Sequence, residues 1–454
     1  MNTRMTRREL LRTLSAAGLG SAFASRVVAD ETEHAGKGAR ELQPFPVKER
    51  PRYPAFLAGG KVIQPERPLP VLHETDVLVV GGGAAGFAAA VAAARAGAKT
   101  TLVERYGYFG GLWTGGLVLL VISTHSTENG QLTLVVRGIG GELLDRLAKL
   151  DGGIVYRGTT KFNPTSDPEA TKFVMDEMVR EAGVKVFFHC WATDVVMDGG
   201  VIRGVVFESK AGRQAILAKT VVDTTGDGDI FAAAGAEHEQ RLHAIGLVHR
   251  LGNVDRSDPA KLKAADFKTL GAIEPQPSVY WVNLRGPSTD GLDLNELTRL
   301  EMEHRRTIWN RVQKMRQAPG GAPLFLLQVA PQVGVRTTRL LAGTHQLTYK
   351  ESREARKFTD TIAVGGAQNG KHPGWPIPYG VLLPKKLDGL LTAGRSSCVD
   401  EKLVEDMRLI GSCLTTGHAA GAAAALAVQS GCWLRDVNIS KLRKLLADQG
   451  AYLG

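Results

Sequence analysis

Cysteine is scarce in this chain, and its spacing excludes two kinds of site. Only four of the 454 residues are cysteines, and none stands in a Cys-x-x-Cys pair. The spacing supports neither a redox-active dithiol nor a zinc knuckle, so we expect no metal site. An even number of cysteines is compatible with a disulfide if the protein is in an oxidising compartment. Cys190 and Cys413, however, are more typical of small buried hydrophobic residues. The other two cysteines are Cys398 and Cys432.

Basic runs interleaved with aromatic residues are also missing. The net charge is +10 and the pI about 9.4, yet the positive residues are scattered along the chain. Scattered charge is typical of a solvated surface, so no nucleic-acid partner is expected. The apolar stretch near the N-terminus, residues 13–24, is too short to predict a stable membrane span.

No heptad or short repeat is apparent in the sequence, which argues against a coiled coil or a solenoid. With 43% hydrophobic residues over 454 positions, the chain can bury a large core and form two lobes. Its 53 glycines and 20 prolines are typical of an α/β enzyme with many tight turns.

The N-terminus has the pattern of an export signal. A twin-arginine pair, Arg7 and Arg8, precedes two leucines, a mild apolar stretch and small-residue cleavage sites. This combination predicts export by the twin-arginine route, with residues 1–29 as the signal peptide and a periplasmic or extracytoplasmic location. The next segment, residues 30–72, is rich in Pro, Lys, Arg and Glu and is predicted to be a linker.

A glycine-rich turn after an apolar strand is the most informative stretch of the chain. In a G-x-G-x-x-G turn, the first glycine allows the bend, the second lets backbone approach a pyrophosphate, and the third lets the following helix pack closely. Gly81, Gly83 and Gly86 take these positions. The N–H groups of Ala84 and Ala85, at the start of an alanine-rich helix, would face the phosphates.

An acidic residue follows this turn at the distance that a dinucleotide site requires. Glu104 ends the next predicted strand, where it can accept hydrogen bonds from a ribose hydroxyl and repel a 2′-phosphate. The alternative is an ordinary βαβ crossover whose glycines serve only packing. The preceding Val- and Leu-rich strand, the alanine-rich helix and the placement of the acid favour the dinucleotide site.

Further segments place small residues where the backbone of a dinucleotide-binding protein approaches its ligand. Two glycine pairs follow Glu104 in a loop. An NAD domain seldom needs such a loop, whereas a flavin dinucleotide, which is longer, needs backbone that passes close to it. Two more apolar strands end in Thr-Gly-Asp at residues 225–227 and in Ala-Gly-Arg at residues 393–395. The additional candidate cofactor-binding residues are Arg105, Gly110, Gly111, Ala192, Gly226, Asp227 and Gly394.

Three strand-to-glycine segments in this order resemble the FAD proteins of the glutathione-reductase structural type. With Gly-Val-Arg at residues 334–336 and Gly-His-Ala-Ala-Gly at residues 417–421, the chain resembles bacterial FAD-dependent oxidoreductases related to fumarate-reductase and heterodisulfide-reductase flavoproteins. The resemblance implies an α/β fold. Its Rossmann-like FAD domain, a parallel sheet with an added β-meander, would be discontinuous, residues 73–239 and 332–454, and its inserted α+β cap would be residues 240–331.

The cofactor expected from this resemblance is FAD. His125 stands too far along the chain to match the histidine that attaches FAD covalently in fumarate reductases, so noncovalent FAD is expected. Gly417, Ala419 and Ala420 are expected to open a helix whose dipole would stabilise negative charge on the reduced flavin. These small residues also suit close packing against the first alanine-rich helix, and both roles are compatible.

Five side chains are candidates for substrate binding and proton transfer. Arg336 and Arg339 could clamp a carboxylate or hydroxylated substrate from one helix face or turn, or instead belong to an ion-pair network between domains. Arg408 matches an arginine of the resembled family, and Glu401 stands where relatives often carry histidine. His418 is expected to be neutral at its helix start, where it would donate a hydrogen bond to flavin or substrate, or merely pack as a cap.

These features predict an exported oxidoreductase that transfers a hydride between a small-molecule substrate and FAD, with oxygen or a redox partner as electron acceptor. A flavin-binding electron-transfer or scaffold protein without its own substrate is the alternative. A tRNA-modifying flavoprotein suits the basic pI but is opposed by the export signal. In the cap, apolar residues at helical spacing predict an amphipathic helix over residues 295–316. The sequence of this helix does not indicate which ligand the cap binds.

Overall fold

The computed structural model describes residues 53–156 and 163–454, and Leu69–Gly454 form the larger of two units in the chain. The predicted signal peptide and the first part of the predicted linker, residues 30–52, lie outside the described residues. In the remainder of that predicted linker, β1 (Phe56–Ala58) pairs antiparallel with β2 (Lys61–Ile63).

The larger unit is built on a seven-stranded sheet with the order β10-β11-β12-β3-β4-β9, in which β23 also pairs with β12. Five of its strands are joined by parallel pairing: β3 (Val71–Val80), β4 (Thr100–Val103), β9 (Lys185–Phe187), β12 (Gly212–Asp223) and β23 (Leu390–Thr392). An antiparallel meander adjoins them, made of β10 (Trp191–Asp198), β11 (Val201–Ser209) and β12 (Gly212–Asp223). This is a Rossmann-like sheet with an added meander, as the sequence predicted.

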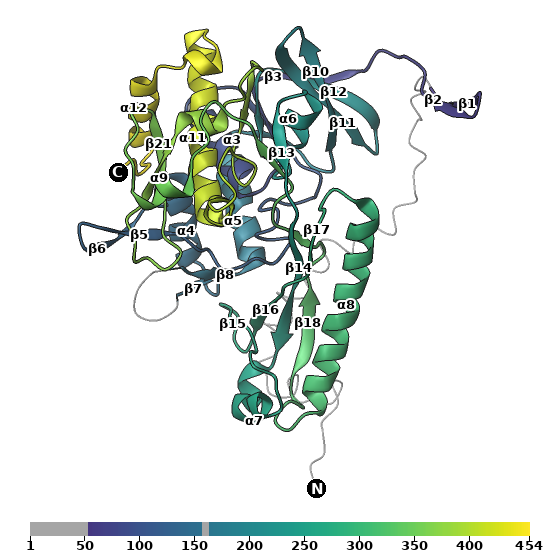
Figure 1. Ribbon diagram of the computed structural model, residues 1–454, viewed down its shortest axis with the longest axis vertical. Coiled ribbons are helices and arrows are strands. Elements are labelled where there is room, and N and C mark those ends of the chain that lie inside the picture. The colour runs from purple at the N-terminus through teal and green to yellow at the C-terminus, as the bar shows by residue number, and fades with distance from the viewer. Residues whose placement is uncertain (1–52, 157–162) are drawn as a thin grey trace, which may run out of the picture. The chain divides into compact units, whose positions relative to one another are not determined.

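Two alanine-rich helices lie side by side against this sheet, α3 (Ala84–Arg95) and α11 (Ile410–Ser430) (Figure 1). Nearly every residue of α3 is buried, which explains its lack of an amphipathic pattern. The two helices approach so closely that a Cβ on Gly421 would lie 2.0 Å from the Ala89 carbonyl oxygen. Glycine at this point is therefore required by helix packing.

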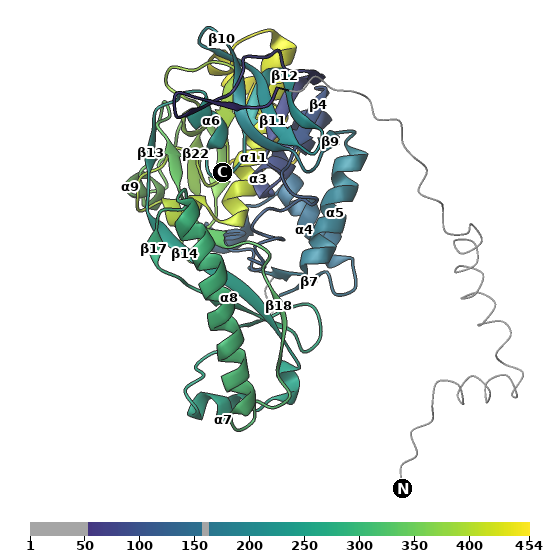
Figure 2. The same ribbon diagram turned by 90° about the vertical axis from the view of Figure 1, so that its right-hand side faces the viewer.

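A second, antiparallel sheet is centred on β14 (His243–Gly252) and has its own hydrophobic core. The long helix α8 (Leu294–Gln317) packs along it and buries Leu300, Ile308 and Val312 (Figure 2). The predicted amphipathic helix over residues 295–316 is confirmed. The other strands are β15 (Ala272–Ile273), β16 (Tyr280–Leu284), β17 (Ser288–Thr289), β18 (Phe325–Val329) and β19 (Gly334–Val335), the last of which lies beyond the predicted cap range.

Shorter elements connect and flank the two sheets. The helices are α4 (Ile139–Ala148), α5 (Pro168–Glu181), α6 (Asp229–Ala233), α7 (Pro259–Ala264), α9 (Tyr349–Arg353), α10 (Val404–Met407) and α12 (Ile439–Asp448). The strands are β5 (His125–Glu128), β6 (Gln131–Leu134), β7 (Ile154–Val155), β8 (Thr165–Ser166), β13 (His238–Gln240), β20 (Arg339–Leu341), β21 (Thr361–Gly365) and β22 (Trp375–Pro378).

Three further observations bear on the exclusions drawn from composition. All four cysteines are free. Among residues 53–156 and 163–454, no cluster of His, Cys, Asp and Glu is placed to hold a metal ion. Over the same ranges, no helix combines the length and the apolar character needed to cross a bilayer.

Candidate cofactor and substrate site

A cleft lies at the carboxyl ends of the parallel strands, where the glycine turn, the acidic strand end and the two later glycine segments meet. Most of the predicted cofactor-binding residues line it: Gly81, Gly83, Ala84, Ala85, Glu104, Arg105, Gly110, Gly111, Gly226, Asp227 and Gly394. Ala192 lines a smaller pocket that shares Gly81, Glu104 and Arg105 with the cleft. The topology thus brings segments more than 300 residues apart into one site.

The three glycines of the first turn are required for different reasons. Gly81 has a φ of +99°, and a Cβ there would lie 2.6 Å from the Thr224 carbonyl oxygen. A Cβ on Gly86 would lie 1.7 Å from the Gly81 carbonyl oxygen. At Gly83, by contrast, a Cβ would meet no protein atom within 4 Å, although the residue lines the cleft. The fold requires Gly81 and Gly86, whereas Gly83 leaves space for a ligand.

Glu104 ends β4 in a buried position and accepts two backbone hydrogen bonds. Its two carboxylate oxygens lie 2.5 Å from the Gly82 nitrogen and 2.8 Å from the Tyr106 nitrogen. Burial raises the pKa of Glu104, and these two hydrogen bonds oppose the shift. Because each carboxylate oxygen has a second acceptor position, the group can still accept a bond from a ribose hydroxyl.

The chain matches the family model described as "FAD dependent oxidoreductase" over residues 76–266 and 248–446. These ranges include every segment that lines the cleft. The chain belongs to this family. It is an FAD-dependent enzyme, and FAD is its cofactor.

Relatives of this FAD-dependent oxidoreductase include thiamine thiazole synthases. The protein from Metallosphaera sedula is 30% identical over 187 residues, which are 38% of this chain and 60% of that protein. The chain therefore spans about 60% of the length of this relative. Similar solved structures include Thermovibrio ammonificans THI4 (25% identity, 36% of this chain, 64% of that chain, TM-score 0.28) and a geranylgeranyl bacteriochlorophyll reductase-like protein from Thermoplasma acidophilum (16%, 84%, 84%, 0.42).

The residues of the cleft fit FAD. Helix α3 begins after Gly83 with no side chain capping its first N–H groups, which leaves these donors for a pyrophosphate. The open space at Gly83 lies beside them. The protein would thus hold the phosphates with backbone N–H groups, and Glu104 would hold the ribose.

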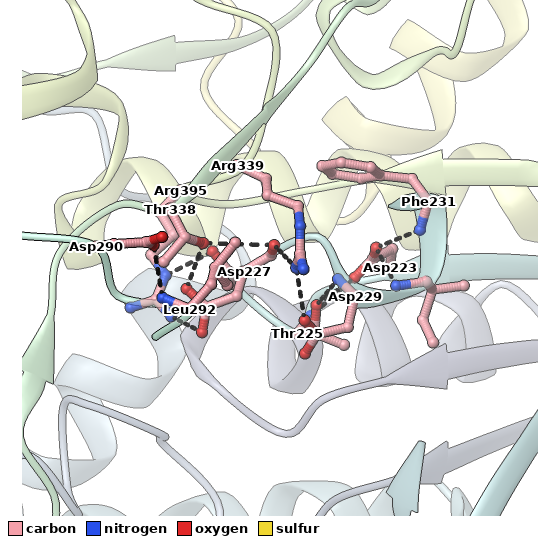
Figure 3. Close-up of polar contacts among 12 residues, drawn as sticks. Asp223, Thr225, Asp227, Asp229, Phe231, Asp290, Leu292, Thr338, Arg339 and Arg395 are labelled. Carbon is pink, nitrogen blue, oxygen red and sulfur yellow. Dashed lines mark hydrogen bonds and ion pairs between the residues drawn. The ribbon is translucent and has the colours of Figure 1, made fainter. Parts of the chain in front are cut away.

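A network of charged side chains supports the Thr-Gly-Asp turn at the edge of the cleft (Figure 3). The Arg395 guanidinium lies 2.8 Å from the Asp227 carboxylate and donates to the Gly226 carbonyl oxygen at 2.6 Å. Thr338 donates to Asp227 at 2.9 Å. Arg395 was not among the predicted site residues, although it directly follows Gly394. The Gly-Arg pair was the sequence signal for it.

A second cavity, of about 410 Å³, adjoins the cofactor cleft. The cleft and the cavity share Leu112, Trp113, Arg395, Arg408 and Ile410 as lining residues. Two of the predicted catalytic residues, Arg336 and Arg408, line this cavity. A small molecule held there would lie directly beside the cofactor.

The predicted clamp of Arg336 with Arg339 is wrong. Arg336 follows β19 and lines the second cavity, whereas Arg339 begins β20 and lies 3.0 Å from the Asp229 carboxylate. Between the two arginines the chain leaves one sheet and enters another, so they share neither a helix face nor a cavity. Arg339 belongs to the ion-pair network, which was the alternative interpretation.

The structure does not bring Glu401 to the site, because it is exposed and lines neither the cleft nor the cavity. Glu405, about one helical turn later, lines the cavity instead. Its carboxylate lies 2.7 Å from His243 Nε2 and also pairs with Arg408. The hydrogen bond to His243 is the largest cause that lowers the pKa of Glu405, to about 2, and Arg408 adds to it. In the sequence, the signal for Glu405 was its position three residues before Arg408, which is the spacing of an ion pair on one helix turn.

The predicted helix start at Gly417 is wrong, because α11 begins at Ile410. Gly417, Ala419 and Ala420 therefore lie within the helix and do not line the cleft; a Cβ on Gly417 would lie 2.1 Å from the Ala85 carbonyl oxygen. Ile410, at the true start, lines both the cleft and the cavity. The helix dipole therefore acts at Ile410, and the small residues from Gly417 to Ala420 allow close helix packing.

His418 has the expected neutral state but not the expected place. It is buried inside α11, and its Nε2 lies 2.7 Å from Gln449 Oε1. Burial lowers the pKa of His418 to about 4, so the imidazole is neutral at pH 7. It lines neither the cleft nor the cavity, and this placement favours the alternative in which His418 packs.

Replacing Gly83 with alanine is expected to weaken FAD binding without destabilising the fold. The added methyl group meets no protein atom, yet it enters the space where the backbone approaches the pyrophosphate. Visible absorbance after FAD titration reports binding, and urea unfolding of the FAD-free protein reports stability. Gly86→Ala is the comparison, because its Cβ clashes with the turn itself. Unchanged FAD affinity in Gly83→Ala would contradict this placement of the cofactor.

Proposed function

We propose that this family member is an exported oxidoreductase that transfers a hydride between a small organic substrate and noncovalently bound FAD. One observation carries the proposal: the cofactor cleft opens directly on a cavity of about 410 Å³. Electron transfer or scaffolding does not need such a cavity, so a substrate-binding enzyme is favoured. The thiamine thiazole synthase match covers only 38% of this chain, so we do not propose that activity here.

When bound, FAD supplies the centre that accepts or donates the hydride. The chain supplies orientation. Arg395 fixes the Asp227 turn on the cofactor side, and Arg408 lines both the cleft and the cavity. Glu405 is a weak base at a pKa of about 2, so its role is to hold Arg408 and His243 in place.

A spectral screen tests this function. The purified chain is loaded with FAD and titrated anaerobically with alcohols, amines, sugars, enones and organic acids while the oxidised-flavin absorbance is followed. Bleaching by one class supports the oxidoreductase proposal. A flavoprotein that no class reduces, and whose chemically reduced form no class reoxidises, would favour the scaffold alternative. Release of the yellow colour on denaturation would support noncovalent binding, and colour that stays with the polypeptide would refute it.

Export is proposed from the twin-arginine pair. Changing Arg7 and Arg8 together to lysine should move the protein from the periplasmic to the cytoplasmic fraction, because the translocation signal depends on the pair. Arg12→Lys, which leaves the pair intact, is the matched control. Cell fractionation followed by immunoblotting measures the distribution. Equal periplasmic amounts in the double variant and the control would contradict the proposed route.

A further inference from the structure

We infer that the cavity beside the flavin cleft binds an organic acid, with its anionic group held by Arg285 and Arg336 and its apolar body against the aliphatic residues of the lining. This inference rests on the proposed function and names the class of its substrate.

The charge lining the cavity is strongly one-sided. Four arginines, Arg285, Arg336, Arg395 and Arg408, line it against the single carboxylate of Glu405. Asp227 neutralises Arg395, and Glu405 pairs with Arg408. In the described part of the chain, neither Arg285 nor Arg336 has a carboxylate within ion-pair distance. Two guanidinium charges are therefore left for a ligand to balance.

Arg336 is held in place before any ligand arrives. It is half-buried, and its Nη1 donates to the Ala244 carbonyl oxygen at 2.5 Å. Burial is the largest cause that lowers the pKa of Arg336, the nearby charges of Arg408 and Arg285 add to it, and the Glu405 carboxylate opposes them. The fold thus places the positive charges of Arg336 and Arg408 close together in a cavity where Arg336 is half-buried. A bound anion relieves this repulsion, whereas a neutral or cationic ligand does not.

The remainder of the cavity is suited to an apolar body. Its wall includes Val118, Leu120, Ile122 and Val248. Trp281 also lines it, and the indole Nε1 of this residue is buried without a hydrogen-bond partner among the described residues. An unpaired buried donor is costly, and a ligand oxygen can satisfy it. Guanidinium charges, a free donor and aliphatic side chains in one cavity together fit a carboxylic acid with a hydrocarbon chain or ring.

The test compares acids with their amides on the FAD-loaded protein. Acetate, butyrate, hexanoate, octanoate and phenylacetate are each titrated beside the matching amide, by isothermal calorimetry and by the change in flavin absorbance. We expect the tightest-binding acid to bind at least about tenfold more tightly than its amide, because the amide leaves the guanidinium charges unbalanced. Among the straight-chain acids, affinity should rise with chain length as the apolar wall is covered.

Arg336→Gln should weaken binding of the acid at least about tenfold and leave binding of the amide unchanged. Arg336→Lys should retain part of the preference, since it keeps the charge but not the planar donor fork. Arg306→Gln, on the exposed side of α8, removes the same charge away from the cavity and should change neither.

The inference is overturned if no acid binds more tightly than its amide, or if Arg336→Gln leaves the acid affinity unchanged. Either result is compatible with an FAD-dependent enzyme acting on a neutral substrate, so the proposed function would survive it. Failure of the protein to hold FAD would instead refute the proposed function. Calorimetry on the FAD-free protein would then still report whether the cavity prefers acids.

Discussion

Replacing Gly421 with leucine is expected to separate α11 from α3 and to abolish FAD binding. Even the smaller Gly421→Ala places a Cβ 2.0 Å from the Ala89 carbonyl oxygen, which is backbone and cannot rotate away. Overpacking costs about 3 kcal/mol at such a site, and the better helix propensity of alanine recovers up to about 1 kcal/mol. The free energy of unfolding should therefore fall by about 2 kcal/mol for alanine and by more for leucine.

Urea unfolding followed by circular dichroism measures this loss, and FAD titration measures its effect on the cleft. Gly200→Ala is the matched control, because a Cβ there meets no atom within 4 Å and its φ is not positive. It should change stability by less than about 0.5 kcal/mol. If Gly421→Ala stabilised the protein, as helix propensity alone predicts, the close approach of the two helices would be wrong.

Asp223→Asn should lower the free energy of unfolding by at least about 3 kcal/mol, because it disrupts two bonds to a buried charge. One carboxylate oxygen accepts from the backbone nitrogen and the hydroxyl of Thr225, at 3.0 and 2.7 Å. The other accepts from the nitrogens of Ile230 and Phe231, at 3.1 and 2.9 Å (Figure 3). An asparagine amide group would face two of these donors with a donor of its own.

The effect should reach the cofactor, since Asp223 joins the end of β12 to α6 across the turn that carries Asp227. Burial raises the pKa of Asp223 to about 6, so at pH 7 it is ionised and able to accept all four bonds. Asp198→Asn is the control. The Asp198 side chain is 79% exposed, and its ion pair with Arg203 is long, at 3.9 Å, so this carboxylate contributes little to the free energy of unfolding. A difference of less than about 0.5 kcal/mol between the two variants would contradict the assigned role.

The parts of the fold that sequence could predict are those set by local chemistry. The bend at Gly81 needs a positive φ, the strand before it ends in a run of Val and Leu at residues 77–80, and an alanine-rich helix follows it, so strand, turn and helix follow from neighbouring residues. The start of α11 does not follow in this way. Gly411 and the two threonines before Gly417 have low helix propensity, yet that segment is helical because it is buried against the rest of the fold.

The residues that line the second cavity were harder to predict, because their partners are distant in the chain. His243 and Glu405 are 162 residues apart, and only the folded chain shows that they form a pair. Arg336 and Arg339 look equivalent in the sequence, but Arg336 follows a strand of the β14 sheet, whereas Arg339 begins β20, which pairs with β13. Spacing can place residues on one element; it cannot say which of two adjoining cavities that element faces.

The lining of the cofactor cleft comes from segments that are far apart in the polypeptide, among them the glycine turn near residue 83 as the first wall and Gly394 to Cys413 as the second. A chain still emerging from the ribosome has the first wall long before the second. The cleft is therefore complete only once the chain has been made through Cys413, and we expect a fragment ending before Gly394 to keep the dinucleotide turn yet lose its ligand. Under the proposed twin-arginine export, the protein would therefore cross the membrane already folded and carrying its nucleotide.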